Sequence, residues 1–160
     1  MSVAFVKEES AETAAETHLP DRPISEHPNL VTEQGLKLLE EQLKAARATH
    51  EVANAVEDIN ERRRQLAPHL RDIRYLVERL RTAQLMPTPE NTNTVAFGAK
   101  VTYTREDGRV QSYRIVGEDE ADPKTGSISY VSPVARALNG KSVGDVAMVS
   151  GQELEITAIE

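Results

Sequence analysis

The stretch LKLLEEQLKAARATHEVA, residues 36–53, decides the fold class of the N-terminal half. Small or apolar side chains, with one histidine, recur there at alternating intervals of three and four residues, which is the spacing of a coiled-coil seam. The seam residues are Leu36, Leu39, Leu43, Ala46, His50 and Ala53. Thr32 precedes the stretch and suits an N-cap, so we expect a helix that begins near Glu33.

A second seam of the same spacing follows after a break, at Leu66, Leu70, Ile73, Val77 and Leu80. Two seams of similar length predict an antiparallel helical hairpin over residues 31–86, with its tip near residue 59. Pro68 interrupts the second seam, and a proline inside a helix costs about 3 kcal/mol. Because the register continues across Pro68, we expect a kinked helix; a helix that began at this proline would move the tip to residues 65–68.

The two segments that flank the hairpin differ from it in composition. Residues 1–30 carry six acidic and two basic side chains, three prolines and few apolar residues. Such a segment buries too little apolar surface to fold by itself, so we expect a disordered tail. Residues 87–95 are polar and contain two prolines, which is typical of a linker.

After this linker the hydrophobic period becomes two, which predicts strands. The predicted strands cover residues 100–105, 110–116, 127–131, 145–150 and 153–159. Asp107 and Gly108 form a strong hairpin turn signal between the first two strands. Ser132 and Pro133 are typical of an N-cap and a first helical turn. Residues 96–160 therefore predict a small, twisted antiparallel sheet with one short helix packed on it.

Composition excludes several functional classes. The chain of 160 residues has no cysteine, which excludes disulfides and thiolate metal sites. No apolar run approaches the roughly 20 residues of a membrane span, and neither a phosphate-binding glycine loop nor a serine nucleophile motif is present. A net charge of −7 is unfavourable for a general nucleic-acid binder. We expect a soluble cytoplasmic monomer in a reducing compartment, with no membrane partner.

The C-terminal residues carry a family resemblance. SYRIVGEDEADPKTGSISYVSPVARALNGKSVGD, residues 112–145, resembles the C-terminal domain of the bacterial Gre transcript-cleavage factors, GreA and GreB. VAFGAKVTY (residues 95–103) and VTEQGLKLLEEQL (residues 31–43) match as well, so the resemblance covers about residues 31–160. It implies an α+β fold, in which an N-terminal antiparallel coiled-coil hairpin precedes a small FKBP-like antiparallel β domain with one short helix.

The resemblance also implies a partner. Gre factors bind bacterial RNA polymerase at the β′ rim of its secondary channel and place the hairpin in that channel. The matching segment implies polymerase contacts at Ser132, Pro133, Ala135 and Arg136. Asp58 and Glu61 match the acids that help the polymerase active site to hold a second Mg²⁺. The protein would thus share this Mg²⁺ with the polymerase, have no cofactor of its own and not be an enzyme by itself.

The predicted tip, VEDINERRR at residues 56–64, has two interpretations. Asp58 followed by Glu61 is a variant of the capping box, in which two side chains satisfy free amides at a helix start. Carboxylates are also suitable ligands for Mg²⁺ in two-metal phosphodiester cleavage. The stretch departs from the Gre pattern, because Glu57 replaces a glycine and Arg62 an asparagine. Each arm also looks about one heptad shorter than in GreA, which shortens the hairpin by roughly 10 Å.

Four arginines share one face of the second predicted helix. They are Arg64, Arg71, Arg74 and Arg81, spaced seven, three and seven residues apart. One interpretation is that Arg64, Arg71 and Arg74 contact nascent RNA, since arginine binds phosphate. The other is a solvated helix face, in which Glu78 pairs with Arg74.

These patterns leave two hypotheses of function, both of which require that residues 96–160 bind RNA polymerase. In the first, the protein is a transcription elongation factor whose Asp58 and Glu61 stimulate cleavage of backtracked RNA. In the second, it resembles the short-hairpin Rnk proteins, and it is a non-catalytic polymerase-binding regulator that competes with Gre factors.

Overall fold

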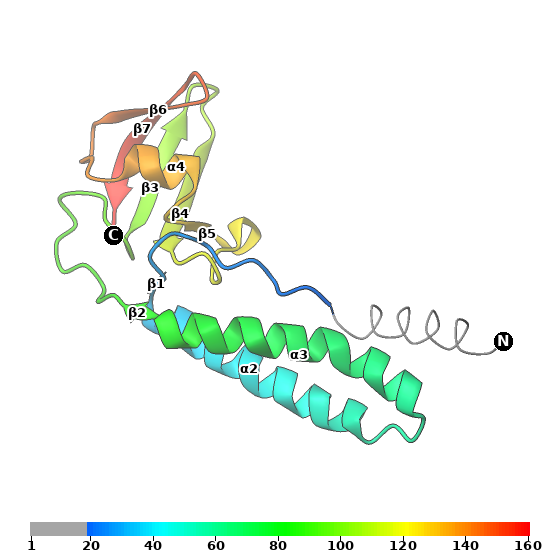
Figure 1. Ribbon diagram of the computed structural model, residues 1–160. Coiled ribbons are helices and arrows are strands. Elements are labelled where there is room, and N and C mark those ends of the chain that lie inside the picture. The colour runs from blue at the N-terminus through cyan, green and yellow to red at the C-terminus, as the bar shows by residue number, and fades with distance from the viewer. Residues whose placement is uncertain (1–18) are drawn as a thin grey trace. The chain divides into compact units, whose positions relative to one another are not determined.

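The computed structural model describes residues 19–160 (Figure 1). The chain divides into two compact units, a hairpin unit and a C-terminal unit. The hairpin unit comprises Leu39–Thr82 and the described residues up to Ser25, and the C-terminal unit comprises Glu26–Leu38 and Ala83–Glu160. The first turns of the first hairpin helix therefore group with the C-terminal unit, whereas we expected them to group with the rest of the hairpin.

The helices α2 (Glu33–Asn54) and α3 (Ile59–Thr82) form the predicted hairpin. Figure 1 shows them side by side, joined by a short turn. The Thr32 hydroxyl accepts a hydrogen bond from the Gly35 amide at 2.9 Å, as expected of an N-cap. Pro68 lies inside α3, so the alternative tip at residues 65–68 is wrong. None of the helices within residues 19–160 combines the length and hydropathy that a bilayer-spanning segment requires.

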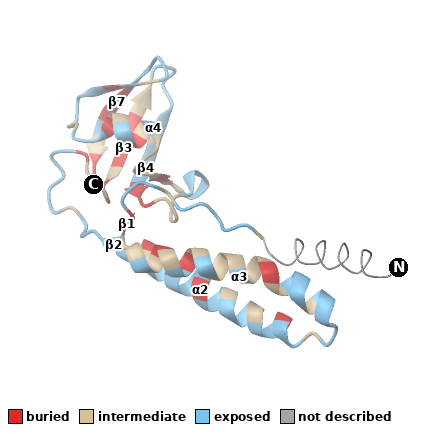
Figure 2. Ribbon diagram, in the orientation of Figure 1, coloured by how far each residue is buried: buried red, intermediate tan, exposed pale blue. Residues whose placement is uncertain are grey.

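Burial along α3, coloured in Figure 2, does not follow the predicted seam. Leu70 and Val77, both expected in the seam, are 40% and 41% exposed. Ala67, Leu76 and Arg79 are buried instead. At about 3.6 residues per turn, Ala67 and Leu76 lie on opposite sides of α3, so its buried residues do not form a single seam. The buried apolar residues of α2 follow the prediction and are Leu39, Leu43 and Ala53.

The described part of the N-terminal segment differs from the expected disordered tail. Within the C-terminal unit, β1 (Leu30–Val31) pairs in parallel with β2 (Gln84–Leu85), and Asn29 is buried. Residues 19–30 thus make defined contacts. Residues 1–18 lie outside the described residues. The contacts are mainly backbone and polar, which explains why the low hydrophobicity of the segment did not predict them.

The C-terminal unit is built on a five-stranded sheet of order β5-β4-β3-β7-β6. Its strands are β3 (Lys100–Arg105), β4 (Val110–Val116), β5 (Ser127–Ser129), β6 (Val146–Val149) and β7 (Gln152–Ile159). Neighbouring strands are antiparallel except β4 and β5, which are parallel. The sheet is therefore mixed, and not antiparallel throughout as expected. Residues 117–126, which contain η1 (Pro123–Thr125), provide the return connection that a parallel pair requires.

The short helix α4 (Pro133–Leu138) packs on this sheet, against β6. Its Ala135 and Leu138 are 2% and 0% exposed and join the apolar residues of the sheet in one core. The other core residues are Val95, Ala99, Val101, Tyr103, Ile115, Ile128, Ala147, Leu154, Ile156 and Ile159. The core thus lies between α4 and the sheet and fixes the position of α4.

Gly117 follows β4 where the backbone of β1 passes close. A Cβ atom at this position would lie 2.3 Å from the Leu30 carbonyl oxygen. Two backbone hydrogen bonds join the β1 and β2 segments beside this contact. The Gln84 amide donates to the Asn29 carbonyl at 2.8 Å, and the Met86 amide donates to the Val31 carbonyl at 2.9 Å. The missing side chain at residue 117 therefore lets the N-terminal segment join the C-terminal unit.

Candidate functional site

The hairpin tip is organised by Asp58. Its Oδ1 accepts a hydrogen bond from the Glu61 amide at 2.8 Å, and its carbonyl accepts one from the Arg62 amide at 2.9 Å. These two bonds make Asp58 the N-cap of α3, so the Asp58 half of the capping-box interpretation is confirmed. Asp58 is exposed, and its Oδ2 has no hydrogen-bond partner within residues 19–160.

The second tip acid, Glu61, is directed along α3. Its Oε1 accepts a hydrogen bond from the Gln65 amide group at 2.9 Å, and its Oε2 lies 3.8 Å from Arg64 Nη1. The return bond of a capping box, from the Asp58 amide to the Glu61 carboxylate, is not formed. The tip therefore carries two exposed acids, one of which caps the helix while the other pairs within it.

As a metal site the tip is incomplete by itself. The described residues contain no group of three or more histidines or acids placed to hold a metal ion. Mg²⁺ commonly takes one or two protein carboxylates and keeps several waters. Asp58 Oδ2 and the Glu61 carboxylate fit such a partial ligand set, which further ligands from another molecule would have to complete.

The arginine face of α3 is largely paired with acids. Arg64 lies 3.8 Å from Glu61, Arg71 lies 3.7 Å from Asp72, and Arg74 lies 2.6 Å from Asp21. All these side chains are substantially exposed, so each pair contributes little to stability.

The expected pairing of Glu78 with Arg74 is wrong. Glu78 instead accepts hydrogen bonds from Arg81 Nε at 2.9 Å and Nη2 at 2.5 Å. These bonds lower the pKa of the Glu78 carboxyl and raise the pKa of Arg81. Arg81 thus forms a bidentate pair one turn from its partner.

The segment predicted to contact a polymerase starts at the N-terminus of α4. The Ser132 hydroxyl accepts a hydrogen bond from the Ala135 amide at 3.3 Å, and Pro133 occupies the first helical turn. The predicted cap is therefore confirmed. Pro133 and Arg136 are exposed, whereas Ala135 packs into the core. Ala135 thus acts mainly by packing, because its side chain offers almost no surface for a partner.

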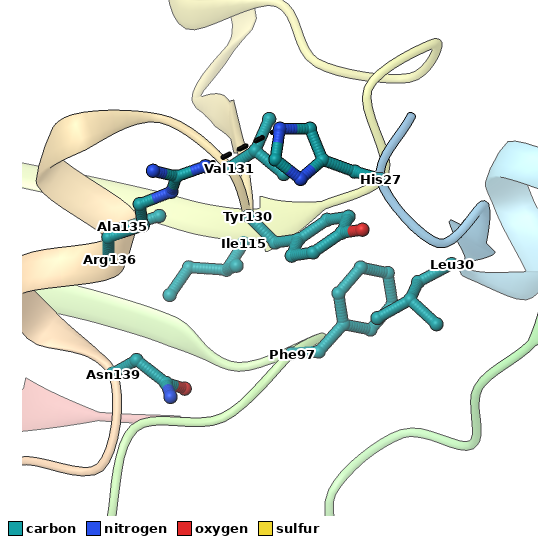
Figure 3. A pocket seen from close by; sticks show the side chains of 9 residues that line it. All are labelled: His27, Leu30, Phe97, Ile115, Tyr130, Val131, Ala135, Arg136 and Asn139. Atoms are coloured by element: carbon teal, nitrogen blue, oxygen red, sulfur yellow. Dashed lines mark hydrogen bonds between the residues drawn. The ribbon is translucent and has the colours of Figure 1, made fainter. Parts of the chain in front are cut away.

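A cavity of about 390 Å³ opens beside α4 (Figure 3). Its lining residues are His27, Leu30, Phe97, Ile115, Tyr130, Val131, Ala135, Arg136 and Asn139. The rings of Phe97 and Tyr130 meet edge to face, with centroids 5.7 Å apart and planes at 75°. Arg136 Nη2 lies 3.5 Å from His27 Nε2, and the Tyr130 hydroxyl donates to the Pro28 carbonyl. The cavity has an aromatic floor and a cationic rim.

Comparisons with known proteins match both halves of the chain. A family model described as "Transcription elongation factor, GreA/GreB, C-term" matches residues 90–160. Transcription elongation factor GreB of Haemophilus influenzae is 39% identical over 129 residues, which cover 75% of this chain and 81% of that protein. The chain belongs to the GreA/GreB family of transcription elongation factors.

Other members of the GreA/GreB family match more locally. Transcription elongation factor GreA of Maricaulis maris is 48% identical over 80 residues, which cover 49% of this chain and 51% of that protein. The chain thus spans about half the length of this GreA relative. Among solved structures, GreA factor homolog 1 (Gfh1) of Thermus thermophilus is 22% identical, with a TM-score of 0.39, over 84% of this chain and 99% of that chain.

Most of the residues that line the cavity of this GreA/GreB family member were not predicted from the sequence. Of the residues predicted to bind a polymerase, Ala135 and Arg136 line the cavity, and Ser132 and Pro133 do not. Phe97 and Tyr130 could have been singled out from the sequence, because aromatic residues are rare in this chain, which has only two phenylalanines and four tyrosines. His27 gave no signal, because it lies in the segment outside the family resemblance.

Proposed function

We propose that this GreA/GreB family protein binds bacterial RNA polymerase through its C-terminal unit and regulates transcription elongation through the secondary channel. The observation that supports it best is the similarity to GreB of Haemophilus influenzae. That match is too long to lie within residues 90–160, so it also includes hairpin residues.

The cavity beside α4 suits a protein partner at the polymerase rim. Interface energy concentrates where aromatic side chains and arginines form a pocket for an anchoring side chain. Phe97 and Tyr130 provide the apolar floor for such an anchor, and Arg136 at the rim provides a charge for an acidic neighbour. Ser132 contributes by capping α4 and so holding Arg136 in place.

At the hairpin tip, Asp58 and Glu61 are our candidates for the acids of transcript cleavage. Asp58 Oδ2 is available for a ligand while Oδ1 holds the helix start. If the polymerase active site completed the ligand set, a bound Mg²⁺ would position the attacking water. In this arrangement the cap orients the carboxylate, so the structural role and the catalytic role of Asp58 coexist.

A second candidate function, a non-catalytic regulator that competes with Gre factors, is favoured by a specific observation. Both tip acids already have structural partners, since Asp58 caps α3 and Glu61 binds Gln65. The arms are also limited in reach, because α2 and α3 contain 22 and 24 residues, or about 33 and 36 Å.

A backtracked elongation complex tests the proposal and separates the two candidates. Asp58→Asn keeps a cap acceptor but removes the charge, whereas Asp58→Ala removes both. If the tip acids act in cleavage, the wild-type protein shortens the RNA and both variants lose this activity. If the protein is a competitor, it does not shorten the RNA but suppresses GreA-stimulated cleavage on titration, and Asp58→Asn suppresses it equally well. A wild-type protein with neither effect would refute the proposal.

A further inference from the structure

The N-terminal segment supplies one wall of the cavity beside α4. His27 and Leu30 line the cavity from this segment, and Figure 3 shows both across the aromatic rings from α4. The remaining lining residues all lie between residues 97 and 139. Without His27 and Leu30, the floor formed by Phe97 and Tyr130 would be open on this side. The shape of the cavity therefore depends on residues that precede the hairpin.

Sequence and backbone contacts fix this wall. His27 precedes Pro28, and a residue before proline is restricted to extended backbone conformations. The Pro28 carbonyl accepts hydrogen bonds from the Tyr130 hydroxyl and from the Leu30 amide. The residue between them, Asn29, is buried. These contacts hold the stretch on the C-terminal unit and so place His27 at the cavity rim.

The imidazole of His27 contacts the guanidinium of Arg136 at this rim. The distance from Arg136 Nη2 to His27 Nε2 is 3.5 Å, which is that of a weak hydrogen bond. A guanidinium group has only donors, so His27 Nε2 accepts and the ring proton lies on Nδ1. Arg136 is exposed on α4, and the contact limits the orientations that its long side chain would otherwise sample.

His27 orients Arg136 without neutralising it. None of the residues that line the cavity is acidic, and within residues 19–160 Arg136 has no acidic partner. An acid in place of His27 would satisfy the guanidinium charge and compete with any acid of a partner. An imidazole that accepts through Nε2 leaves this charge for the partner, and it reduces the side-chain freedom that binding has to remove.

We propose that residues 27–30 are part of the polymerase-docking face and that His27 is a positioning residue, which holds Arg136 towards an acidic side chain of RNA polymerase. The inference rests on the proposed docking at this cavity. It deepens that proposal, because it assigns part of the docking face to the N-terminal segment, which precedes the family-model match at residues 90–160.

The equilibrium affinity of the full chain for bacterial core polymerase tests the proposal. His27→Ala should weaken binding about fivefold, because Arg136 then loses its preferred orientation before binding. His27→Gln should restore most of the affinity, since its side-chain carbonyl can accept the same hydrogen bond. Ile24→Ala is the matched control, because Ile24 belongs to the same segment and does not line the cavity, so this variant should bind like the wild type.

A double-mutant cycle separates positioning from a passive wall. If His27 acts through Arg136, His27→Ala should have no further effect in an Arg136→Ala background. The same fivefold weakening in that background would overturn the positioning role. In the chain without polymerase, nitrogen NMR should show the His27 proton on Nδ1 in the wild type and a shift towards Nε2 in Arg136→Ala. A wild-type ring with its proton on Nε2 would also overturn this role.

The affinities also separate this proposal from the proposed function. If the wild type binds polymerase and Arg136→Glu weakens binding, while His27→Ala binds like the wild type, the docking face stands and the role of His27 is wrong. Tighter binding by His27→Ala would show that the segment covers the face, which would overturn the proposal as well. A wild type that does not bind core polymerase would refute the proposed function and this inference with it.

Discussion

Substitution of Gly117 by alanine should detach β1 from the C-terminal unit. The added Cβ would lie 2.3 Å from the Leu30 carbonyl oxygen, well inside the 3.0 Å that Cβ atoms keep from other heavy atoms. The obstacle is backbone, so the clash is relieved only if the strand moves. Movement breaks the two hydrogen bonds between β1 and β2, worth about 1 kcal/mol each. It also exposes Val31, which is 3% exposed in the intact structure.

Together these losses should lower the free energy of unfolding of the C-terminal unit by about 3 kcal/mol. Urea unfolding of the full chain, followed by tyrosine fluorescence, measures the change. Gly108→Ala is the matched control, because its added Cβ meets nothing within 4 Å. Its only expected loss of stability, about 1 kcal/mol, comes from placing a side chain at a φ of +85°. If Gly117→Ala were no more destabilising than Gly108→Ala, the close approach of β1 would be wrong.

Three further predictions concern single side chains. Asp58→Ala should lower the free energy of unfolding by about 1 kcal/mol and Asp58→Asn by much less, because only alanine removes the cap acceptor; equal losses in urea unfolding would contradict the cap. The charged form of Glu78 is favoured in the folded state, so its contribution to stability is present above its ordinary pKa and is lost as the pH falls through its lowered folded-state pKa. In an NMR titration, Arg81→Gln should raise the pKa of Glu78 towards its ordinary value, and an unchanged midpoint would exclude Arg81 as the cause of the shift. Tyr130→Phe removes the donor to the Pro28 carbonyl and should cost about 1 kcal/mol; a variant as stable as the wild type in urea would show that this bond contributes nothing.

The helical hairpin was predictable because its signals are local. Spacings of three and four residues between leucines, a threonine cap and an aspartate cap all depend on residues within one or two turns of each other. The same holds for α4, where Ser132 and Pro133 mark the helix start. Local signals also placed the strands β3 and β4 at their observed ends.

The register of α3 was not predictable in the same way. Leu76 and Val77 are both apolar, so the spacing alone does not decide which of them is buried. Arg79 is 1% exposed, although arginine is among the residues least often buried. Such burial depends on partners that are distant in sequence, which a helical period does not encode.

The walls of the candidate cavity depend on long-range contacts. His27 and Leu30 come from the N-terminal segment, whereas Phe97 and Tyr130 lie far along the chain. The pairing of β1 with β2 involves only two residues on each strand, too few to show a period of two. Composition predicted disorder for residues 1–30 because it reports apolar content, while the described residues 19–30 are held by backbone hydrogen bonds and charge.

The equilibrium affinity of the full chain for bacterial core polymerase shows whether the face beside α4 binds RNA polymerase. Arg136→Glu reverses the charge at the cavity rim, and Arg109→Glu makes the same change in the turn between β3 and β4, away from the cavity. We predict that the wild type binds, that Arg136→Glu binds at least about tenfold more weakly, and that Arg109→Glu binds like the wild type. Failure of the wild-type chain to bind, or equal weakening by both reversals, would contradict this prediction.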